Sequence, residues 1–95
     1  MNKYEIMYIL KADLAEAAVK DEETKLQGII EAQGGKVTET KEWGVRDLAY
    51  AIKKQKKGYY VILKVSADEA CLVEFDRLAK LDNNVIRHLI TIDQD

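Results

Sequence analysis

The segment NKYEIMYIL, residues 2–10, alternates apolar side chains with other side chains along its length. A repeat of two residues is typical of a β-strand that has one face against a hydrophobic core. The face expected to be buried carries Tyr4, Ile6, Tyr8 and Leu10. The opposite face carries Lys3, Glu5, Met7 and Ile9. The chain is therefore predicted to begin with a strand, and the order of the other elements follows from it.

A helix is predicted to follow this strand. Asp13 and Glu16 have the spacing of an N-terminal capping box. Apolar residues then recur at helical spacing between positions 15 and 30. The Gly-Gly pair at 34–35 is the kind of signal that ends a helix, since glycine adopts the left-handed backbone conformation needed there.

Two further strands are predicted to form a long hairpin. Residues 36–43 alternate again, and an extended stretch continues to position 52 beyond Gly44, which indicates a bulge or a sharp bend. The lysine-rich segment 53–58 is expected to be the loop. Residues 59–65 form a β-branched and aromatic run that is typical of a strand.

A second helix and a last strand complete the pattern. Ser66 and Glu69 have the spacing of another capping box, and an apolar stripe covers residues 72–79. A turn at 82–84 leads into a strand over 85–92. The buried face of this strand is left open between two sets: Ile86, His88, Ile90 and Ile92, or Val85, Arg87, Leu89 and Thr91.

The order of elements is β-α-β-β-α-β, which defines an α+β fold of the ferredoxin-like type. Right-handed crossovers place both helices on one face of a four-stranded antiparallel sheet. The chain contains no linker or repeat, so residues 1–95 are expected to form a single domain.

The charge is distributed unevenly along the chain. A net charge of −2 argues against a strong stand-alone nucleic-acid binder. Between Lys36 and Lys64, however, eight Lys and Arg residues outnumber three Asp and Glu residues, so this segment carries +5 and the rest −7. Such a segment suits contact with an anion or docking beside a more basic partner, although a solvated lysine-rich loop is the simpler explanation.

The sequence has none of the motifs of metal or nucleotide chemistry. His88 and Cys71 lie in different predicted elements, and no glycine-rich phosphate loop occurs. No apolar run approaches the ~18 residues of a membrane span, and no signal-peptide pattern is present. We expect a cytoplasmic protein that is not an enzyme and has no cofactor, metal site, membrane partner or small-molecule substrate.

The predicted fold leaves one face of the sheet without helices. On its two central strands the outward positions are Met7, Ile9, Tyr60 and Ile62, where a solvated sheet has polar residues. An apolar patch of this kind marks a binding surface. We expect another protein to dock on it; cover by the hairpin or by a second copy of the chain is the alternative.

The segment EWGVRDLAYAIKK, residues 42–54, and the sequence KGYY at 57–60 resemble the signature of the bacterial small-subunit ribosomal protein S6 family. That family typically has Trp-Gly, a basic pair, Leu-Ala-Tyr, an isoleucine, and Gly-Tyr at the start of the third strand. The pairs at 4–5 and 34–35 and the sequence NVIR at 84–87 match further landmarks. The resemblance extends over essentially the whole chain.

The resemblance implies a structural component of the small ribosomal subunit without enzymatic activity. It also implies a heterodimer with a small, very basic protein, S18, and binding of the pair to the small-subunit (16S) ribosomal RNA. Three features of this sequence differ from the family pattern, so the roles that the family implies there do not transfer directly. Asp47 stands where the family often has a second basic residue, Ala51 stands where many members have proline, and the sequence ends at Asp95 without a longer charged tail.

Eight residues are expected to contact RNA: Asn2, Lys3, Arg46, Lys53, Lys54, Lys56, Lys57 and Arg87. Arg87 is the strongest of these because a guanidinium donates paired hydrogen bonds to a phosphate or a base edge. A surface salt bridge is the alternative for Arg87, an anchor for the partner is the alternative for Arg46, and solubility of the hairpin tip is the alternative for the four lysines.

Six residues are expected to contact the partner protein: Met7, Ile9, Trp43, Tyr50, Tyr60 and Ile62. Aromatic anchors dominate many interfaces. For Trp43 and Tyr50, packing of the bent hairpin against its own sheet is an equally good alternative.

Two other functions share this topology. An RNA-recognition motif stacks bases on aromatic residues of its third strand. The sequence KGYYVILK at 57–64 begins like the octapeptide of that motif but departs from it at Tyr60, Val61 and Lys64. A dimeric regulatory domain is the other possibility, because one fold serves many functions.

Overall fold

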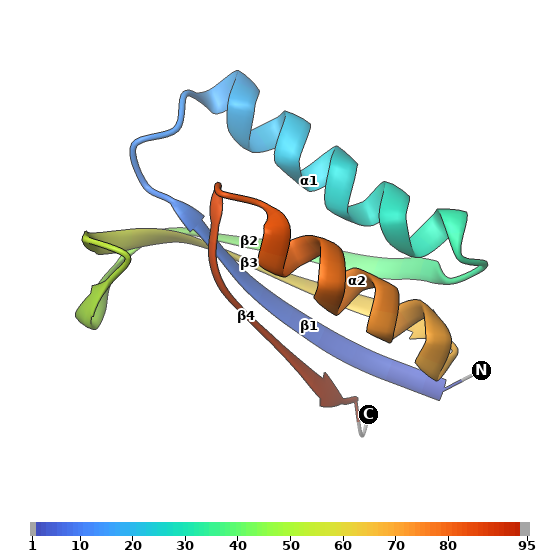
Figure 1. Ribbon diagram of the computed structural model, residues 1–95. Helices are drawn as coiled ribbons and strands as arrows, with labels where there is room; N and C mark the ends of the chain where they lie inside the picture. Colours follow the sequence, from blue (N-terminus) through green and yellow to red (C-terminus); the bar gives the residue numbers. More distant parts are fainter. Residues whose placement is uncertain (1, 94–95) are drawn as a thin grey trace.

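The computed structural model describes residues 2–93 and confirms the predicted order of elements (Figure 1). The strands are β1 (Asn2–Lys11), β2 (Lys36–Ile52), β3 (Gln55–Ala67) and β4 (Val85–Ile92), and the helices are α1 (Glu16–Ala32) and α2 (Glu69–Leu81). Neighbouring strands are antiparallel, in the order β2-β3-β1-β4. Both helices cover the same face of the sheet, so the ferredoxin-like prediction is confirmed.

The hydrophobic core lies between the sheet and the two helices. Ile6, Tyr8 and Leu10 of β1 are fully buried, as their alternation predicts. Leu26 of α1 and Phe75 of α2 are also fully buried. Full burial of a large apolar side chain contributes about 1.5–3 kcal/mol, so packing of the helices on the central strands supplies a large part of the stability.

β4 contains a bulge at Ile86, which has no opposite residue on β1. The bulge shifts the alternation by one residue, so neither of the two sets left open by the sequence is buried as a whole. Val85 and His88 lie on the helix side of the sheet, whereas Arg87 and Leu89 lie on the other side.

The helix N-termini differ from the prediction. α1 starts after Ala15 and α2 starts after Asp68, and neither of these residues makes a capping hydrogen bond through its side chain. The capping boxes predicted at Asp13 and Ser66 are therefore wrong. Ser66 belongs to β3 instead, because it pairs with residues of both neighbouring strands.

The C-terminus of α1 agrees with the prediction. Gly34 has a φ of +83°, and its N–H donates to the carbonyl oxygen of Glu31 at 3.1 Å. The N–H of Gly35 donates to the carbonyl oxygen of Ile30 at 2.9 Å. These two bonds make a Schellman motif, which satisfies carbonyl groups that the helix end leaves without partners.

The β2–β3 hairpin turns more tightly than predicted. Its turn consists of Lys53 and Lys54, at φ values of +50° and +67°, and β3 already begins at Gln55. Positive φ at both central residues is typical of a type I′ turn, whose twist matches that of the paired strands. The predicted loop over 53–58 is therefore wrong, because most of it is strand.

Three register shifts interrupt the pairing of β2 with β3. One of them lies at Gly44, where φ is +81°, and confirms the bulge predicted there. The largest shift leaves residues 48–51 of β2 opposite Lys56 alone. We call residues 48–51 the hairpin bulge.

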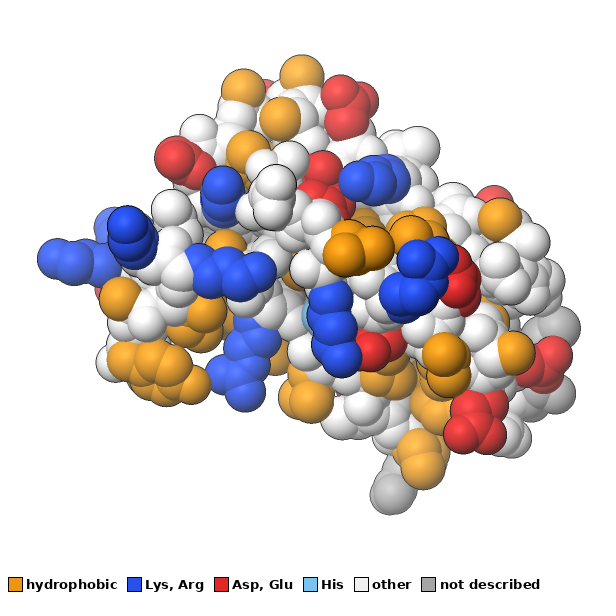
Figure 2. All heavy atoms as spheres, in the orientation of Figure 1, with side chains coloured by type: hydrophobic (Ala, Val, Ile, Leu, Met, Phe, Trp, Pro, Cys, Tyr) orange, Lys and Arg blue, Asp and Glu red, His pale blue; other side chains and the backbone are white. Residues whose placement is uncertain are grey.

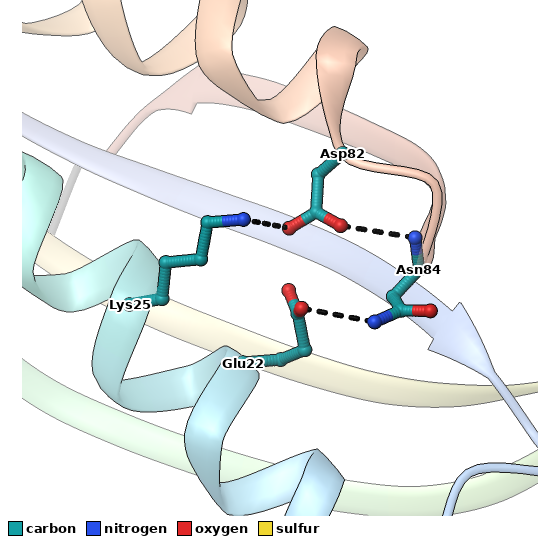
Figure 3. Close-up of polar contacts among 4 residues, drawn as sticks. All are labelled: Glu22, Lys25, Asp82 and Asn84. Atoms are coloured by element: carbon teal, nitrogen blue, oxygen red, sulfur yellow. Dashed lines mark hydrogen bonds and ion pairs between the residues drawn. The ribbon is translucent and has the colours of Figure 1, made fainter.

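A polar network joins α1 to the turn before β4 (Figure 3). Lys25 Nζ lies 3.2 Å from Asp82 Oδ2, and the backbone N–H of Asn84 donates to Asp82 Oδ1 at 3.0 Å. The side-chain amide of Asn84 donates to Glu22 Oε1 at 3.0 Å. Burial alone would raise the pKa of Asp82, but its hydrogen bonds hold that pKa below the usual range. The network fixes the turn from which β4 enters the sheet.

Gly58 of β3 provides a first prediction. A Cβ added at this position would overlap Ile9 Cγ2 and would lie 3.4 Å from Ile86 Cδ1. Gly58→Ala is expected to lower the free energy of unfolding by ~1–3 kcal/mol, because Ile9 must move in a packed environment. Chemical denaturation measures this change. Gly28→Ala in α1, where the added Cβ meets no atom within 4 Å apart from its chain neighbours and the backbone of its own helix, is the control and is expected to stabilise by ~0.5–1 kcal/mol. Equal losses in both variants would contradict the prediction.

The buried carboxyl group of Glu23 provides a second prediction. Glu23 is 8% exposed, its Oε1 has no hydrogen-bond partner among residues 2–93, and burial followed by the charge of Glu42 raises its pKa. The protonated form is therefore favoured by folding, so this contribution to stability is complete below the ordinary carboxyl pKa and is lost as pH rises through the folded-state pKa. The free energy of unfolding of Glu23→Gln is expected to be ~1 kcal/mol higher than that of wild type at pH 8 and equal to it at pH 4.

Urea titrations at several pH values measure this difference. Glu31→Gln, at an exposed position of the same helix, is the control. A gain from Glu23→Gln that stays the same at pH 4 and pH 8 would show that burial of the charge is not its cause.

Candidate functional site

The strand register defines the sheet face without helices, called the open face below. One row across its centre consists of Ile62, Met7 and Leu89. The next row towards the hairpin consists of Tyr60, Ile9 and Arg87. Five of these six side chains are apolar or aromatic, so the predicted apolar character of the open face is present in the structure.

The hairpin bulge covers part of the open face. In Figure 1 the tip of the β2–β3 hairpin bends away from the helices. Leu48, Tyr50 and Ile52 line a hollow of about 150 Å³ together with Met7 and Leu89 of the central row. The tip therefore packs towards its own sheet, as in the alternative given for Tyr50, whereas Trp43 does not line this hollow.

The apolar patch is less open than the sequence predicts. Ile9 and Ile62 are buried, at 3% and 6% exposed, and Met7 and Tyr60 are half-buried. Ile9 is covered because it lies in the hollow under the hairpin tip and packs against the backbone at Gly58. Partial cover by the hairpin, the alternative given for this face, is therefore present in the structure.

Three large apolar or aromatic side chains remain exposed in this region. Trp43 and Tyr50, both predicted, are 50% and 64% exposed, and Leu89 is 48% exposed. Leu89 was missed because its side of the sheet depends on the bulge at Ile86, for which the sequence carries no signal. These three side chains supply the apolar surface that another molecule can reach.

Aromatic residues of β2 orient two of the three arginines. The guanidinium carbon of Arg46 lies 5.4 Å from the ring centre of Trp43, within the range of a cation–π interaction. Arg87 Nη1 donates to the Tyr50 hydroxyl at 3.2 Å. Arg77 instead pairs with a carboxylate of its own helix. Within residues 2–93 neither of the first two forms an ion pair, so no carboxylate offsets the positive charge of either.

Lysine and arginine side chains gather over the hairpin, on the left in Figure 2. All four predicted lysines are exposed: Lys53, Lys54, Lys56 and Lys57. Lys53 Nζ donates to the carbonyl oxygen of Val85 at 3.3 Å, which ties the turn to β4. Lys57 Nζ lies 3.9 Å from Asp47 Oδ1, so its charge is partly offset by the aspartate that departs from the family pattern.

Asn2 and Lys3 lie at the far end of the sheet from the hairpin. Arg87 is opposite Ile9, which is six residues along β1 from Lys3, and this separation corresponds to about 20 Å. Asn2 and Lys3 line a separate hollow with Ile92. The residues expected to contact RNA therefore form two groups, and the structure does not bring Lys3 and Arg87 together.

The helix side of the sheet has a cleft of about 260 Å³ between the start of α1 and the hairpin. The Tyr59 hydroxyl donates to Glu42 Oε2 at 2.7 Å in its wall, and this bond raises the pKa of Tyr59 to about 12. None of the predicted site residues lines this cleft. Residues 2–93 contain no cluster of metal-ligating side chains. No helix in the described part of the chain is long and apolar enough to cross a membrane.

Comparison with known proteins agrees with this architecture. The family model described as ribosomal protein S6 matches residues 3–91. The small ribosomal subunit protein bS6 of Halalkalibacterium halodurans is 47% identical over 95 residues, with all of both chains covered. The crystal structure of the 30S ribosomal protein S6 of Thermotoga maritima superimposes with a TM-score of 0.91 at 26% identity, covering 97% of this chain and 87% of that one. The chain therefore belongs to the ribosomal protein S6 family.

Proposed function

We propose that this protein is a structural, non-catalytic component of the small ribosomal subunit in the cytoplasm, and that it binds the small-subunit ribosomal RNA together with the basic protein S18. Family membership and the name of the Halalkalibacterium halodurans relative support the location. The observation that carries the binding role is that exposed aromatic side chains and arginines without carboxylate partners lie together on the hairpin and open face.

The partner protein in this proposal docks on the open face. The side chains that it reaches are Met7, Trp43, Tyr50, Tyr60 and Leu89. Aromatic side chains are common anchors because they bury much area for little loss of conformational freedom. Ile9 and Ile62 support this surface from beneath, since both are buried in the chain alone.

The RNA in this proposal approaches the hairpin. Arg46, Arg87 and the exposed lysines provide positive charge there, while Asn2 and Lys3 provide a second contact at the other end of β1. A chain with a net charge of −2 releases few counterions by itself. A very basic partner adds phosphate contacts, and each of these strengthens binding in a salt-dependent way.

Reconstitution tests the proposed function. A fragment of the small-subunit ribosomal RNA that contains its central domain is mixed with the chain, with S18, and with both proteins. We expect the pair to bind at least tenfold more tightly than the chain alone at 150 mM salt, because the partner adds phosphate contacts. Equal binding by the chain alone would favour an RNA-recognition motif, and no association with S18 would contradict the proposal.

A substitution at Leu89 tests whether S18 docks on the open face. Leu89→Asp is expected to weaken the affinity for S18 at least tenfold, because a carboxylate would be desolvated at the centre of the interface. Isothermal titration calorimetry measures the affinity. The matched control is Leu81→Asp at the end of α2, where the side chain is 68% exposed. An equal effect of both substitutions would exclude the open face as the specific docking surface.

A further inference from the structure

We propose that Trp43 and Tyr50 are positioning residues for RNA, which hold Arg46 and Arg87 in orientations that bind phosphate groups of the RNA backbone. This inference rests on the proposed binding of ribosomal RNA. It assigns the two aromatic side chains a role that is separate from contact with the partner protein.

The contact between Arg87 and Tyr50 leaves most of the guanidinium available. A guanidinium has five N–H donors, and the Tyr50 hydroxyl accepts from Nη1. A phosphate takes two parallel hydrogen bonds from a guanidinium. Because the hydroxyl is neutral, it orients the group without cancelling its charge.

The hairpin end is fixed well enough to act as a support. Tyr50 lies in the hairpin bulge, next to the tight turn at Lys53. Lys53 Nζ is hydrogen-bonded to the carbonyl oxygen of Val85 at 3.3 Å, two residues before Arg87. Two side-chain hydrogen bonds therefore connect the hairpin end to β4, and Arg87 is held across strands by one of them.

The contact between Arg46 and Trp43 works in a similar way. The guanidinium carbon lies over the face of the ring, 5.4 Å from the ring centre, so the electron-rich face attracts the cation without a carboxylate. Within residues 2–93 no hydrogen bond uses the N–H donors of Arg46, and a guanidinium donates in a planar fork that matches a phosphate. An arginine already held in one orientation loses less side-chain entropy on binding.

Arg77 shows what a purely structural arginine looks like in this fold. Both its Nε and Nη2 are bonded to the Glu74 carboxylate, which lies three residues away on α2. A carboxylate also orients an arginine, but it adds a negative charge that repels a phosphate and occupies the donors that a phosphate would use. The aromatic partners of Arg46 and Arg87 therefore point to an anionic ligand.

The two arginines belong to different strands. Arg46 is on β2 and Arg87 is on β4, the two edges of the sheet. Three strand spacings separate these edges, which amounts to about 14 Å. We therefore expect the two arginines to contact different phosphates and their effects to add, as they do for separated sites.

A double-mutant cycle tests the inference on the full-length chain in its pair with S18. The probe is the central-domain RNA fragment, and the readout is the dissociation constant. Tyr50→Phe removes only the hydroxyl and is expected to weaken RNA binding about threefold. Arg87→Lys is expected to weaken it by a similar or larger factor, and Tyr50→Phe is expected to cause no additional loss in the Arg87→Lys background.

A parallel cycle uses Trp43→Leu and Arg46→Lys. Each substitution is expected to weaken RNA binding about threefold, and Trp43→Leu is expected to cause no additional loss of RNA affinity in the Arg46→Lys background. Arg77→Lys is the matched control and is expected to leave RNA affinity unchanged. Affinity for S18 is measured separately for every variant, so that a loss of RNA affinity is distinguished from a loss of the pair itself. Thermal unfolding confirms that each variant folds.

Four results would overturn the inference. The first is that Tyr50→Phe leaves RNA affinity unchanged, and the second is that Tyr50→Phe lowers RNA affinity by the same factor in the Arg87→Lys background as in wild type. The third is that Tyr50→Phe weakens binding to S18 and not to RNA. The fourth is that the wild-type pair fails to bind the RNA. The last result would also overturn the proposed function, whereas the first three would leave that function standing.

Discussion

Pairing of β1 on both sides is the constraint on which the rest of the structure depends. This strand lies between β3 and β4, so its backbone fixes the register of both neighbours. Because side chains alternate along a strand, one choice of register decides which residues enter the core and which lie on the open face. The fully buried row of Ile6, Tyr8 and Leu10 determines that choice, and the position of Met7 and Ile9 follows from it.

The regular parts of the fold were predictable because they depend on periodic burial. The alternation of residues 2–10 and the Gly-Gly stop at 34–35 predicted the first strand and the end of α1 correctly. The capping boxes failed because Asp13 and Ser66 lie two residues before the observed N-cap positions, Ala15 and Asp68, and neither of these makes a side-chain capping hydrogen bond. A spacing of three residues is too common to locate a helix start by itself.

The irregular parts determine the candidate site, and they were harder to predict. Bulges shift the alternation without changing the residue types around them, as at Ile86 and in residues 48–51. For this reason the sequence identified Trp43 and Tyr50 as surface residues but left the side of Arg87 and Leu89 open. The hydrogen bond from Asn84 to Glu22 of α1 fixes the position at which β4 begins. The bulge at Ile86 then turns Arg87 towards the hairpin, where it donates to Tyr50.

The interrupted pairing of β2 also affects how this molecule meets others. β2 is an edge strand, and an edge with a regular row of free N–H and C=O groups is a template for adding a further strand from another chain. Register shifts near Val37, Gly44 and the hairpin bulge break that row into short pieces. Addition of a strand from another chain along this edge is thereby disfavoured, which lowers the tendency of the free protein to aggregate. Contact through the face of the sheet is then the easier way for another molecule to bind.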